Sequence, residues 1–329
     1  MLLAGDIGGT KTVLALYAEN AAEDVLTPVV EETFPSKDYA SLEDVVLKFL
    51  NGRSEKPLVA SFGVAGPVFG QEAKVTNLPW HINTDVIQAK TGIPQAFLLN
   101  DLESIATAVP HLSGDDLATI NEGKQNATGA IGVVAPGTGL GEGFLVWNGD
   151  KYLACPSEGG HSAFAPTNAI QRELLTYLEL RFTHVSVERV CSGSGIPNLY
   201  QFLKETDRFE EPPWLHDQLE AAADATPVIM TAAINKQANI CIATLDLFIA
   251  ILGSECSNMA VKVLSTGGLY LGGGIPPRIV SQLQDGRFMA NFTDKGRFSQ
   301  LMQDMPVHVI LNAKAGLLGA AYYGLDAIS

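Results

Sequence analysis

One pattern occurs twice in the chain, about 130 residues apart: an apolar strand, a glycine- and threonine-rich turn, and a second apolar strand. The first copy is Ala4-Gly-Asp-Ile-Gly-Gly-Thr, and the second is Val134-Ala-Pro-Gly-Thr-Gly-Leu. A third candidate strand follows each copy, at 29–34 and at 151–154, so each copy opens a three-stranded meander. Helical and strand patterns then alternate. The repeat therefore predicts an α/β fold with a duplicated βββαβαβα core.

The length of 329 residues favours about two domains. We expect a small α/β domain at 1–110 together with 313–329, and a large α/β domain at 111–312. In the small domain, a capping residue at Ser41 and apolar residues at helical spacing predict a helix that Gly52 ends. A hairpin-like segment is expected at 75–78, and a strand at 264–270 in the large domain.

The charge balance limits the partners of this chain. With 21 Lys and Arg against 36 Asp and Glu, the net charge is −15, which excludes a broad basic surface for nucleic acid. The longest apolar stretch, at 241–253, contains Asp246 and is too short to span a bilayer, so no membrane partner is expected. Without a secretory signal pattern at the start, we expect a cytoplasmic protein with four reduced thiols.

Glycine is enriched, with 32 residues, and several glycine clusters come directly after predicted strands. Glycine lets a backbone approach phosphate closely, and consecutive N–H groups form an anion-binding nest. The two repeated turns are therefore candidates for gripping a triphosphate from opposite sides. They comprise Gly5, Gly8, Gly9 and Thr10 in the first copy and Gly137, Thr138 and Gly139 in the second. A P-loop or a dinucleotide fingerprint is rejected because a strand, rather than a helix, follows the first turn. Ordinary tight turns remain the alternative.

Asp6 is a carboxylate inside an otherwise apolar strand, where it costs free energy unless it has a partner. The functional interpretation is an outer-shell contact to a magnesium ion on nucleotide phosphates. The alternative is a capping residue of an Asx turn.

Asn100-Asp101 ends a buried-looking strand just before a helix. Ligands of α/β sheets bind at the carboxyl ends of strands, so Asp101 is a candidate to accept the proton of an attacking substrate hydroxyl. The alternative is a helix N-cap, and the local sequence does not separate the two.

Further polar residues suit a polyol, because neighbouring hydroxyls donate and accept hydrogen bonds together. Glu158 and His161 bracket two glycines in Ser157-Glu-Gly-Gly-His161, which favours a ligand contact. Glu188 is a weaker candidate, and its alternative is an exposed carboxylate paired with Arg189. Asn77 lies on a predicted loop, where an ordinary turn is the alternative.

Together these motifs resemble the bacterial glucokinase family, of the superfamily that contains hexokinase, actin and the heat-shock ATPases. The matching segments run the whole length: Gly5-Asp-Ile-Gly-Gly-Thr10, Asn100-Asp101, Gly137-Thr-Gly-Leu-Gly141, Glu158-Gly-Gly-His161, Val187-Glu-Arg-Val190, Gly272-Gly-Gly-Ile275, Asp294-Lys-Gly-Arg-Phe298 and Gly316-Leu-Leu-Gly319. The resemblance implies a two-lobed actin-like ATPase fold with a hinge, and ATP-dependent phosphorylation of D-glucose at its 6-hydroxyl.

The resemblance also implies roles for single residues. Asp101 would be the general base, and glucose hydroxyls would contact Asn77, Asn100, Asp101, Glu158, His161 and Glu188. Gly267, Gly268 and Gly273 would lie along the adenosine, and magnesium would accompany the ATP. A homodimer is expected.

Two departures refine the resemblance. Lys11 follows Thr10, as in the broader repressor–kinase sugar family, but the cysteine-rich zinc loop of that family is absent from the sequence. We therefore expect no zinc and favour the zinc-free glucokinase group. The alternatives are a kinase for another hexose or an N-acetylhexosamine, a sugar-sensing repressor, or an actin-like ATPase. A repressor needs a DNA-binding module, for which the segment ahead of Gly5 leaves no room.

Overall fold

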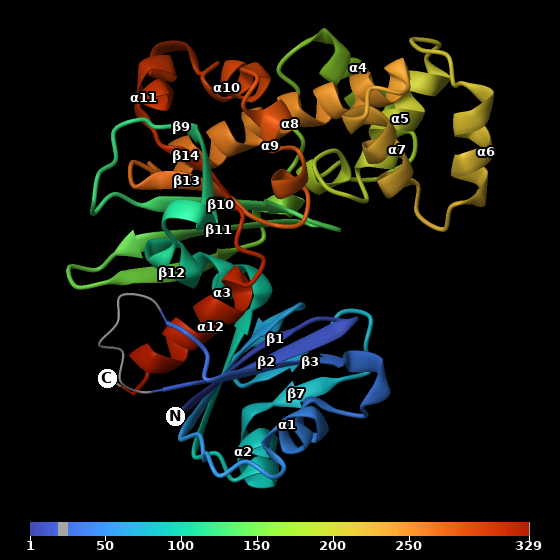
Figure 1. Cartoon of the computed structure of the whole chain (residues 1–329). Helices are drawn as coiled ribbons and strands as arrows, with labels where there is room; N and C mark the ends of the chain where they lie inside the picture. Colours follow the sequence, from blue (N-terminus) through green and yellow to red (C-terminus); the bar gives the residue numbers. More distant parts are fainter. Residues whose placement is uncertain (19–25, 329) are drawn as a thin grey trace. The chain divides into compact units, whose positions relative to one another are not determined.

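The computed structural model describes residues 1–18 and 26–328 (Figure 1). The chain groups into two compact units. The first unit comprises Met1–Asp116, Asn148–Pro156 and Asn312–Ser329, and the second comprises Leu117–Trp147 and Ser157–Leu311. The expected domain boundaries near 110 and 313 stay a prediction.

The first unit contains a five-stranded sheet in the order β3-β2-β1-β4-β8. Strands β1 (Leu2–Ile7), β2 (Lys11–Tyr17) and β3 (Val30–Pro35) form the antiparallel meander, and β4 (Val59–Val64) and β8 (Gln95–Asn100) extend it in parallel. The helices of this unit are α1 (Leu42–Leu50), α2 (Thr84–Thr91), α3 (Asp101–Ala108) and α12 (Ala315–Asp326). The predicted first helix is confirmed, since Ser41 caps α1.

The sheet of the second unit repeats this topology. It includes, in order, β11 (Leu140–Trp147), β10 (Ile131–Pro136), β13 (Gly268–Leu271), β14 (Val307–Ile310) and β9 (Leu117–Asn121). Strand β10 pairs antiparallel with β11 and parallel with β13, as β1 pairs with β2 and β4. The third strand of the repeat is β12 (Tyr152–Ser157). The predicted α/β fold with a duplicated core is therefore confirmed.

Helices make up most of the rest of the second unit. They are α4 (Ala169–Glu179), α5 (Ile196–Glu205), α6 (Pro213–Ala221), α7 (Ala225–Ile234), α8 (Asn239–Val263), α9 (Val280–Leu283), α10 (Arg287–Phe292) and α11 (Ser299–Asp304). Helix α8 is long and apolar enough to cross a membrane, but 78% of its most apolar window is buried inside the protein. Helices α5, α7 and α10 pack against it (Figure 1). We interpret α8 as the central core helix of this unit.

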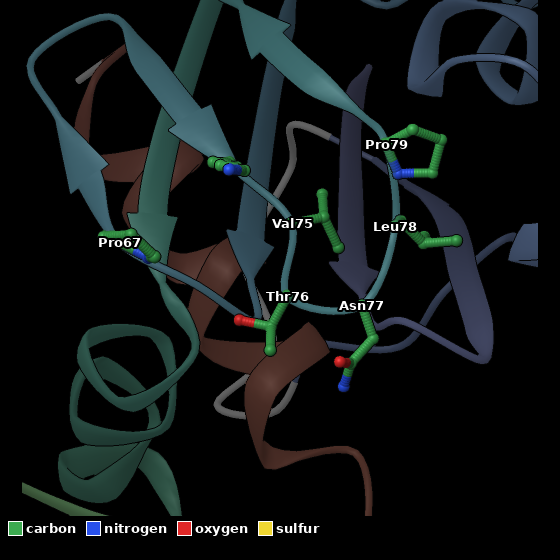
Figure 2. A pocket seen from close by; sticks show the side chains of 7 residues that line it. Pro67, Val75, Thr76, Asn77, Leu78 and Pro79 are labelled. Carbon is green, nitrogen blue, oxygen red and sulfur yellow. The ribbon is translucent and has the colours of Figure 1, made fainter.

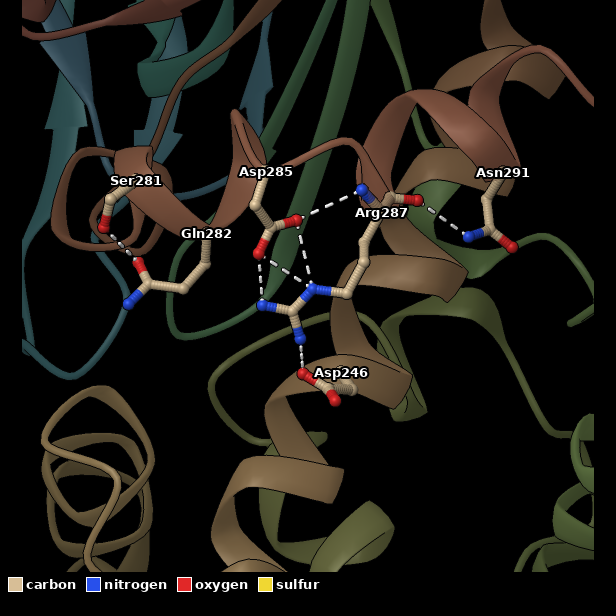
Figure 3. Close-up of polar contacts among 6 residues, drawn as sticks. All are labelled: Asp246, Ser281, Gln282, Asp285, Arg287 and Asn291. Carbon is tan, nitrogen blue, oxygen red and sulfur yellow. Dashed lines mark hydrogen bonds and ion pairs between the residues drawn. The ribbon is translucent and has the colours of Figure 1, made fainter.

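Helices α8 and α10 are in close contact, and ion pairs of one arginine lie at one end of this contact (Figure 3). The Arg287 guanidinium pairs with Asp246 on α8 and with Asp285 just before α10. Further along α8, a Cβ added at Gly253 would lie 2.7 Å from the carbonyl oxygen of Phe288. Glycine at this position therefore allows the two helices to approach closely.

Two expected elements differ from the structure. The strand expected at 264–270 is only β13, because Leu264 adopts a left-handed φ of 53° and residues 264–267 form the turn after α8. The hairpin-like segment expected at 75–78 is a loop. It joins β6 (Glu72–Lys74) to β7 (His81–Asn83) in a small sheet that also contains β5 (Val68–Phe69).

Candidate active site

The first glycine turn connects β1 to β2 and packs on two other loops. The Gly8 N–H donates to the carbonyl of Lys11 at 3.0 Å, and the Ser36 hydroxyl donates to the carbonyl of Gly8 at 2.8 Å. A Cβ added at Gly9 would lie 2.7 Å from the Thr76 carbonyl oxygen. The sequence at Gly8-Gly9 therefore reflects a close backbone approach, and the turn has a fixed conformation before any ligand binds.

Gly5 has a different role from the rest of this turn. A Cβ at Gly5 would lie 2.6 Å from Phe62 Cδ1 and 2.9 Å from Leu14 Cδ2, both in the buried core. Packing of the strand therefore explains this glycine.

Asp6 lies near the end of β1, where burial and two charged groups affect the pKa of its carboxyl. Burial raises the pKa of Asp6, the Lys11 ammonium opposes this change, and the Asp101 carboxylate adds to it. A Cβ at Gly316, in the first turn of α12, would lie 3.5 to 3.7 Å from the atoms of the Asp6 carboxyl group. Two carboxylates that influence each other beside a glycine turn are a suitable arrangement for a hydrated cation.

Asn100 and Asp101 divide two tasks at the junction of β8 and α3. The Asn100 side-chain oxygen accepts a hydrogen bond from the Glu103 N–H at 2.5 Å, so Asn100 is the N-cap. Asp101 is the first residue of the helix, and its Oδ1 accepts from the Leu102 N–H at 2.9 Å. The alternative interpretation of Asp101 as the cap is wrong, because the preceding residue takes that position.

Asn77 lies on the loop between β6 and β7, with a left-handed φ of 65°. The loop lines a cavity of about 360 Å³ together with Pro67 and Lys74. Figure 2 shows the Thr76 and Asn77 side chains on the same side of the loop, away from Pro79. Since the first glycine turn packs on Thr76, the loop joins Asn77 to that turn within the first unit.

The second glycine turn, between β10 and β11, is backed by another loop. The Gly137 N–H donates to the Gly139 carbonyl at 2.9 Å. The Gly193 and Ser194 N–H groups donate to the carbonyls of Gly137 and Thr138 at 2.8 and 3.0 Å. The turn is thus the counterpart of the first one, and the carbonyls of Gly137 and Thr138 already accept hydrogen bonds from the neighbouring loop.

Glu188 lies against this second turn. Its Oε2 accepts a hydrogen bond from the Leu140 N–H at 2.9 Å, and a Cβ at Gly139 would meet the same oxygen at 2.5 Å. Arg189 lies over the ring of Phe182 at 4.4 Å from its centroid. The expected alternative, a surface pair of Glu188 with Arg189, is therefore not what the structure contains.

Glu158 and His161 lie at the two ends of a short 3-10 turn, Gly159–His161, that follows β12. Glu158 Oε2 lies 3.7 Å from His161 Nε2, and the side chains are 86% and 63% exposed. Below the turn there is no space for larger residues. A Cβ at Gly159 would lie 2.0 Å from Glu142 Oε2, and one at Gly160 would lie 2.2 Å from the Leu140 carbonyl oxygen. The glycines bring this turn down on β11, while the Glu158 and His161 side chains point into solvent.

The three expected adenosine glycines do not lie together. A Cβ at Gly273 would lie 2.5 Å from the Pro136 carbonyl oxygen, next to the second glycine turn. Gly267 and Gly268 are buried at the other end of β13, where the Gly267 N–H donates to the Ala130 carbonyl at 2.9 Å. Gly273 therefore stays beside the candidate phosphate turn, whereas close packing on residues 129–131 explains Gly267 and a left-handed φ of 121° explains Gly268.

Sequence reasoning missed Glu142, which is 1% exposed on β11. Within residues 1–18 and 26–328, its Oε1 has no hydrogen-bond partner. Burial and the Glu255 carboxylate raise the pKa of Glu142 to about 7, and the Lys262 ammonium opposes them. A signal was present, because Glu142 is a carboxylate in an apolar strand, as Asp6 is in the first repeat.

Comparison with known proteins gives one consistent result. A sequence model described as glucokinase matches residues 3–327. A glucokinase of Nostoc punctiforme is 41% identical over 98% of both chains. Among solved structures, a glucokinase from an Antarctic psychrotroph is 32% identical, covers 99% of this chain and 98% of its own, and superposes with a TM-score of 0.88. A ROK family glucokinase from Streptomyces griseus, in complex with glucose and AMPPNP, shares the fold at 18% identity and a TM-score of 0.62, over 99% of both chains.

Proposed function

Since this chain belongs to the glucokinase family, we propose that Asp101 is the general base of its reaction. The protein is an enzyme that phosphorylates glucose with ATP, giving glucose 6-phosphate and ADP for glycolysis. The location of Asp101 at the carboxyl end of β8, with Asn100 as the cap in its place, is the observation that carries the assignment. A carboxylate is not needed as the helix cap here, so it can serve chemistry.

In this mechanism the Asp101 carboxylate accepts the proton of the sugar 6-hydroxyl. The oxygen of that hydroxyl attacks the γ-phosphorus as the bond from phosphorus to the ADP oxygen breaks. No covalent enzyme intermediate is needed, so positioning and electrostatic stabilisation supply most of the acceleration.

The phosphates of ATP would bind to the two glycine turns. Their backbones are fixed by Ser36 and Thr76 in the first unit and by Gly193 and Ser194 in the second. The N–H groups of Gly8 and Gly137 are bonded within their own turns, so those of Gly9, Thr10, Thr138 and Gly139 would face the phosphoryl oxygens, with Gly273 beside the second turn. Such turns bind anions without a lysine patch, which suits a chain of net charge −15.

A magnesium ion fits this arrangement only if the nucleotide holds it. The residues at 1–18 and 26–328 include no group of three or more His, Cys, Asp or Glu side chains that could bind a metal. Asp6, partly buried near the first turn and within electrostatic range of Asp101, would contact the hydration shell of the ion. The ion would neutralise charge on the phosphates. Zinc is not part of this proposal.

The sugar would be recognised by Glu158 and His161, whose exposed side chains face each other, and by Asn77 beside its cavity. Asn100 would contribute through its side-chain NH2 group, because its side-chain oxygen caps α3. We assign Glu188 a shared role, because its carboxylate also supports the second glycine turn.

The test is ADP release from the purified enzyme with glucose, mannose, fructose and N-acetylglucosamine, with and without magnesium. We expect glucose to give the highest kcat/KM and chelation of magnesium to abolish turnover. A higher kcat/KM for another hexose or for the N-acetyl sugar would replace glucose as the preferred substrate. Full turnover after chelation would remove Asp6 from its assigned role.

A homodimer and a cytoplasmic location complete the proposal. Light scattering of the eluted protein should give twice the mass of 35.0 kDa. A monomer mass at all concentrations would contradict the dimer. Cell fractionation should recover the protein with other cytoplasmic enzymes.

A further inference from the structure

The turn that presents Glu158 and His161 lies directly on a buried carboxyl group. Glu142 is 1% exposed, and its Oε2 lies 2.0 Å from the position that a Cβ of Gly159 would take. The neighbouring contact, of Gly160 on the Leu140 carbonyl oxygen, involves backbone alone. The carboxyl of Glu142 is therefore the side-chain surface that defines how closely Gly159 approaches β11.

The same short segment of β11 connects the turn to the second glycine turn. Leu140 donates its N–H to Glu188 and receives Gly160 on its carbonyl, and Glu142 receives Gly159 two residues later. Glu142 contacts the Gly159–His161 turn through its side chain, whereas Glu188 contacts the N–H of Leu140. A change at Glu142 should therefore affect glucose, whereas a change at Glu188 should affect both substrates.

The surroundings of Glu142 disfavour its ionised form. Its charged and titratable neighbours are Glu255 and Lys262 on α8 and the buried thiols of Cys191 and Cys256. Lys262 lies 3.8 Å from Glu255 Oε1, and it therefore compensates Glu255 first. Burial and Glu255 raise the pKa of Glu142 to about 7, so the carboxyl is mostly protonated and uncharged when the pH is well below 7.

On the side of the turn, the titratable groups are Glu158 and His161, which are mostly exposed to solvent. They lie above the two glycines, whereas Glu142 lies below them. A test of Glu142 therefore compares variants with wild type at each pH.

We propose that neutral Glu142 is a positioning residue for the Gly159–His161 turn. Its contact with Gly159 fixes the distance of this turn from β11, so that Glu158 and His161 can contact the sugar. The inference rests on the proposed sugar contacts of those two residues. Ionisation of Glu142 would place a second buried negative charge beside Glu255. The turn would then move away from β11, because a buried carboxylate is stabilised by contact with water. Glucose affinity should then fall as the pH rises, while ATP affinity changes little.

Glu142→Gln tests this directly, because glutamine has the same shape and stays neutral. KM values for glucose and for ATP are measured from about pH 6 to about pH 9, together with kcat. The ratio of glucose KM between wild type and Glu142→Gln should rise about threefold or more across this range, with the ATP ratio constant. A glucose ratio that stays constant with pH would overturn the proposal.

Glu142→Asp supplies a second measurement, because the aspartate side chain is one methylene shorter and leaves a gap below Gly159. We expect about a tenfold higher glucose KM near pH 6, with less than about a threefold change in ATP KM. Unchanged glucose KM in this variant would also overturn the proposal. If Glu142→Asp does not fold, the pH comparison with Glu142→Gln decides alone.

Two controls separate this inference from the proposed function. Glu211→Gln removes a partly buried carboxylate of the same unit, outside the turn, and should leave the glucose KM ratio independent of pH. Glu158→Gln tests the sugar contact itself. If Glu158→Gln leaves glucose KM unchanged, the proposed contact fails, whatever Glu142 does. If only the Glu142 variants fail to respond, the contact stands and the positioning role is wrong.

Discussion

The Glu188 carboxylate accepts a hydrogen bond from the Leu140 N–H at 2.9 Å, at the point where the second glycine turn enters β11. These residues are 48 positions apart in the chain. Glu188 therefore contributes to the shape of the candidate phosphate turn as well as standing among the candidate sugar ligands.

Replacing Glu188 with Ala should raise the KM for ATP and the KM for glucose together. The Leu140 N–H loses a charged acceptor, which is worth about 1.5–3 kcal/mol, or about tenfold or more in affinity. Glu188→Gln keeps an acceptor oxygen and should have a smaller effect. Steady-state kinetics with each substrate varied will measure both constants. Glu173→Ala, an exposed acid of the same unit, is the control. An increase confined to glucose would contradict the role in the turn.

Asp101→Asn should lower kcat about 10²–10⁴-fold, because the amide cannot accept the hydroxyl proton. Glucose binding, measured by calorimetry, should stay within about threefold of wild type, since the amide retains hydrogen-bonding capacity. Asp85→Asn is a matched control, because Asp85 also lies in the first turn of a helix with an asparagine cap, Asn83. Near-normal turnover of the Asp101 variant would show that another group accepts the proton.

Gly159→Ala and Gly160→Ala should both destabilise the protein, by about 1–3 kcal/mol each, because each added methyl overlaps an atom of β11. Their rescue should differ. Combining Gly159→Ala with Glu142→Ala removes the overlapping carboxyl, so the double variant should be more stable than the sum of the two single effects. Gly160→Ala overlaps the Leu140 backbone and should gain nothing from Glu142→Ala. Denaturant unfolding will measure each free energy. Equal coupling for both glycines would contradict the contact geometry.

The sequence was sufficient to predict the duplicated fold because each repeat has its own local pattern of strand, turn and strand. The turns, the Asn100-Asp101 pair and the Glu158–His161 segment were likewise recognisable from short motifs. The small sheet of β5, β6 and β7 was not predicted, since its strands have only two or three residues each. Such short segments carry no readable alternation of apolar and polar residues.

The missing parts of the site depend on contacts between distant segments. Nothing near Glu188 in the sequence indicates that Leu140 is its partner, and nothing near Gly267 indicates that it packs on Ala130. Whether Asn100 or Asp101 caps the helix depends on where the helix begins in three dimensions, because both residue types serve as caps. Glu142 is the opposite case, because a lone carboxylate in an apolar strand is a signal that the sequence itself carries.

The Glu211 carboxylate is the centre of a partly buried cluster in the second unit, and its pKa is shifted in the opposite direction from that of Glu142. It accepts hydrogen bonds from the Tyr200 hydroxyl at 2.6 Å, from Lys204 at 2.8 Å and from His216 at 2.9 Å, and its side chain is 9% exposed. Burial alone would raise the pKa of Glu211, but hydrogen bonds from Lys204, Tyr200 and His216 together lower it below its usual value.

Because the folded pKa of Glu211 lies below the unfolded one, its stabilisation is present above the ordinary glutamate pKa and is lost as the pH falls through the folded value. Glu211→Gln should therefore lower the free energy of unfolding by about 1–2 kcal/mol near pH 7, and the difference from wild type should shrink below about pH 4.5. Urea unfolding at a series of pH values will measure it. Glu205→Gln is the control, because this half-exposed acid pairs with Arg181 at the surface and should show a small difference at every pH. A difference for Glu211→Gln that is constant with pH would mean that its stabilisation comes from packing and not from the charge.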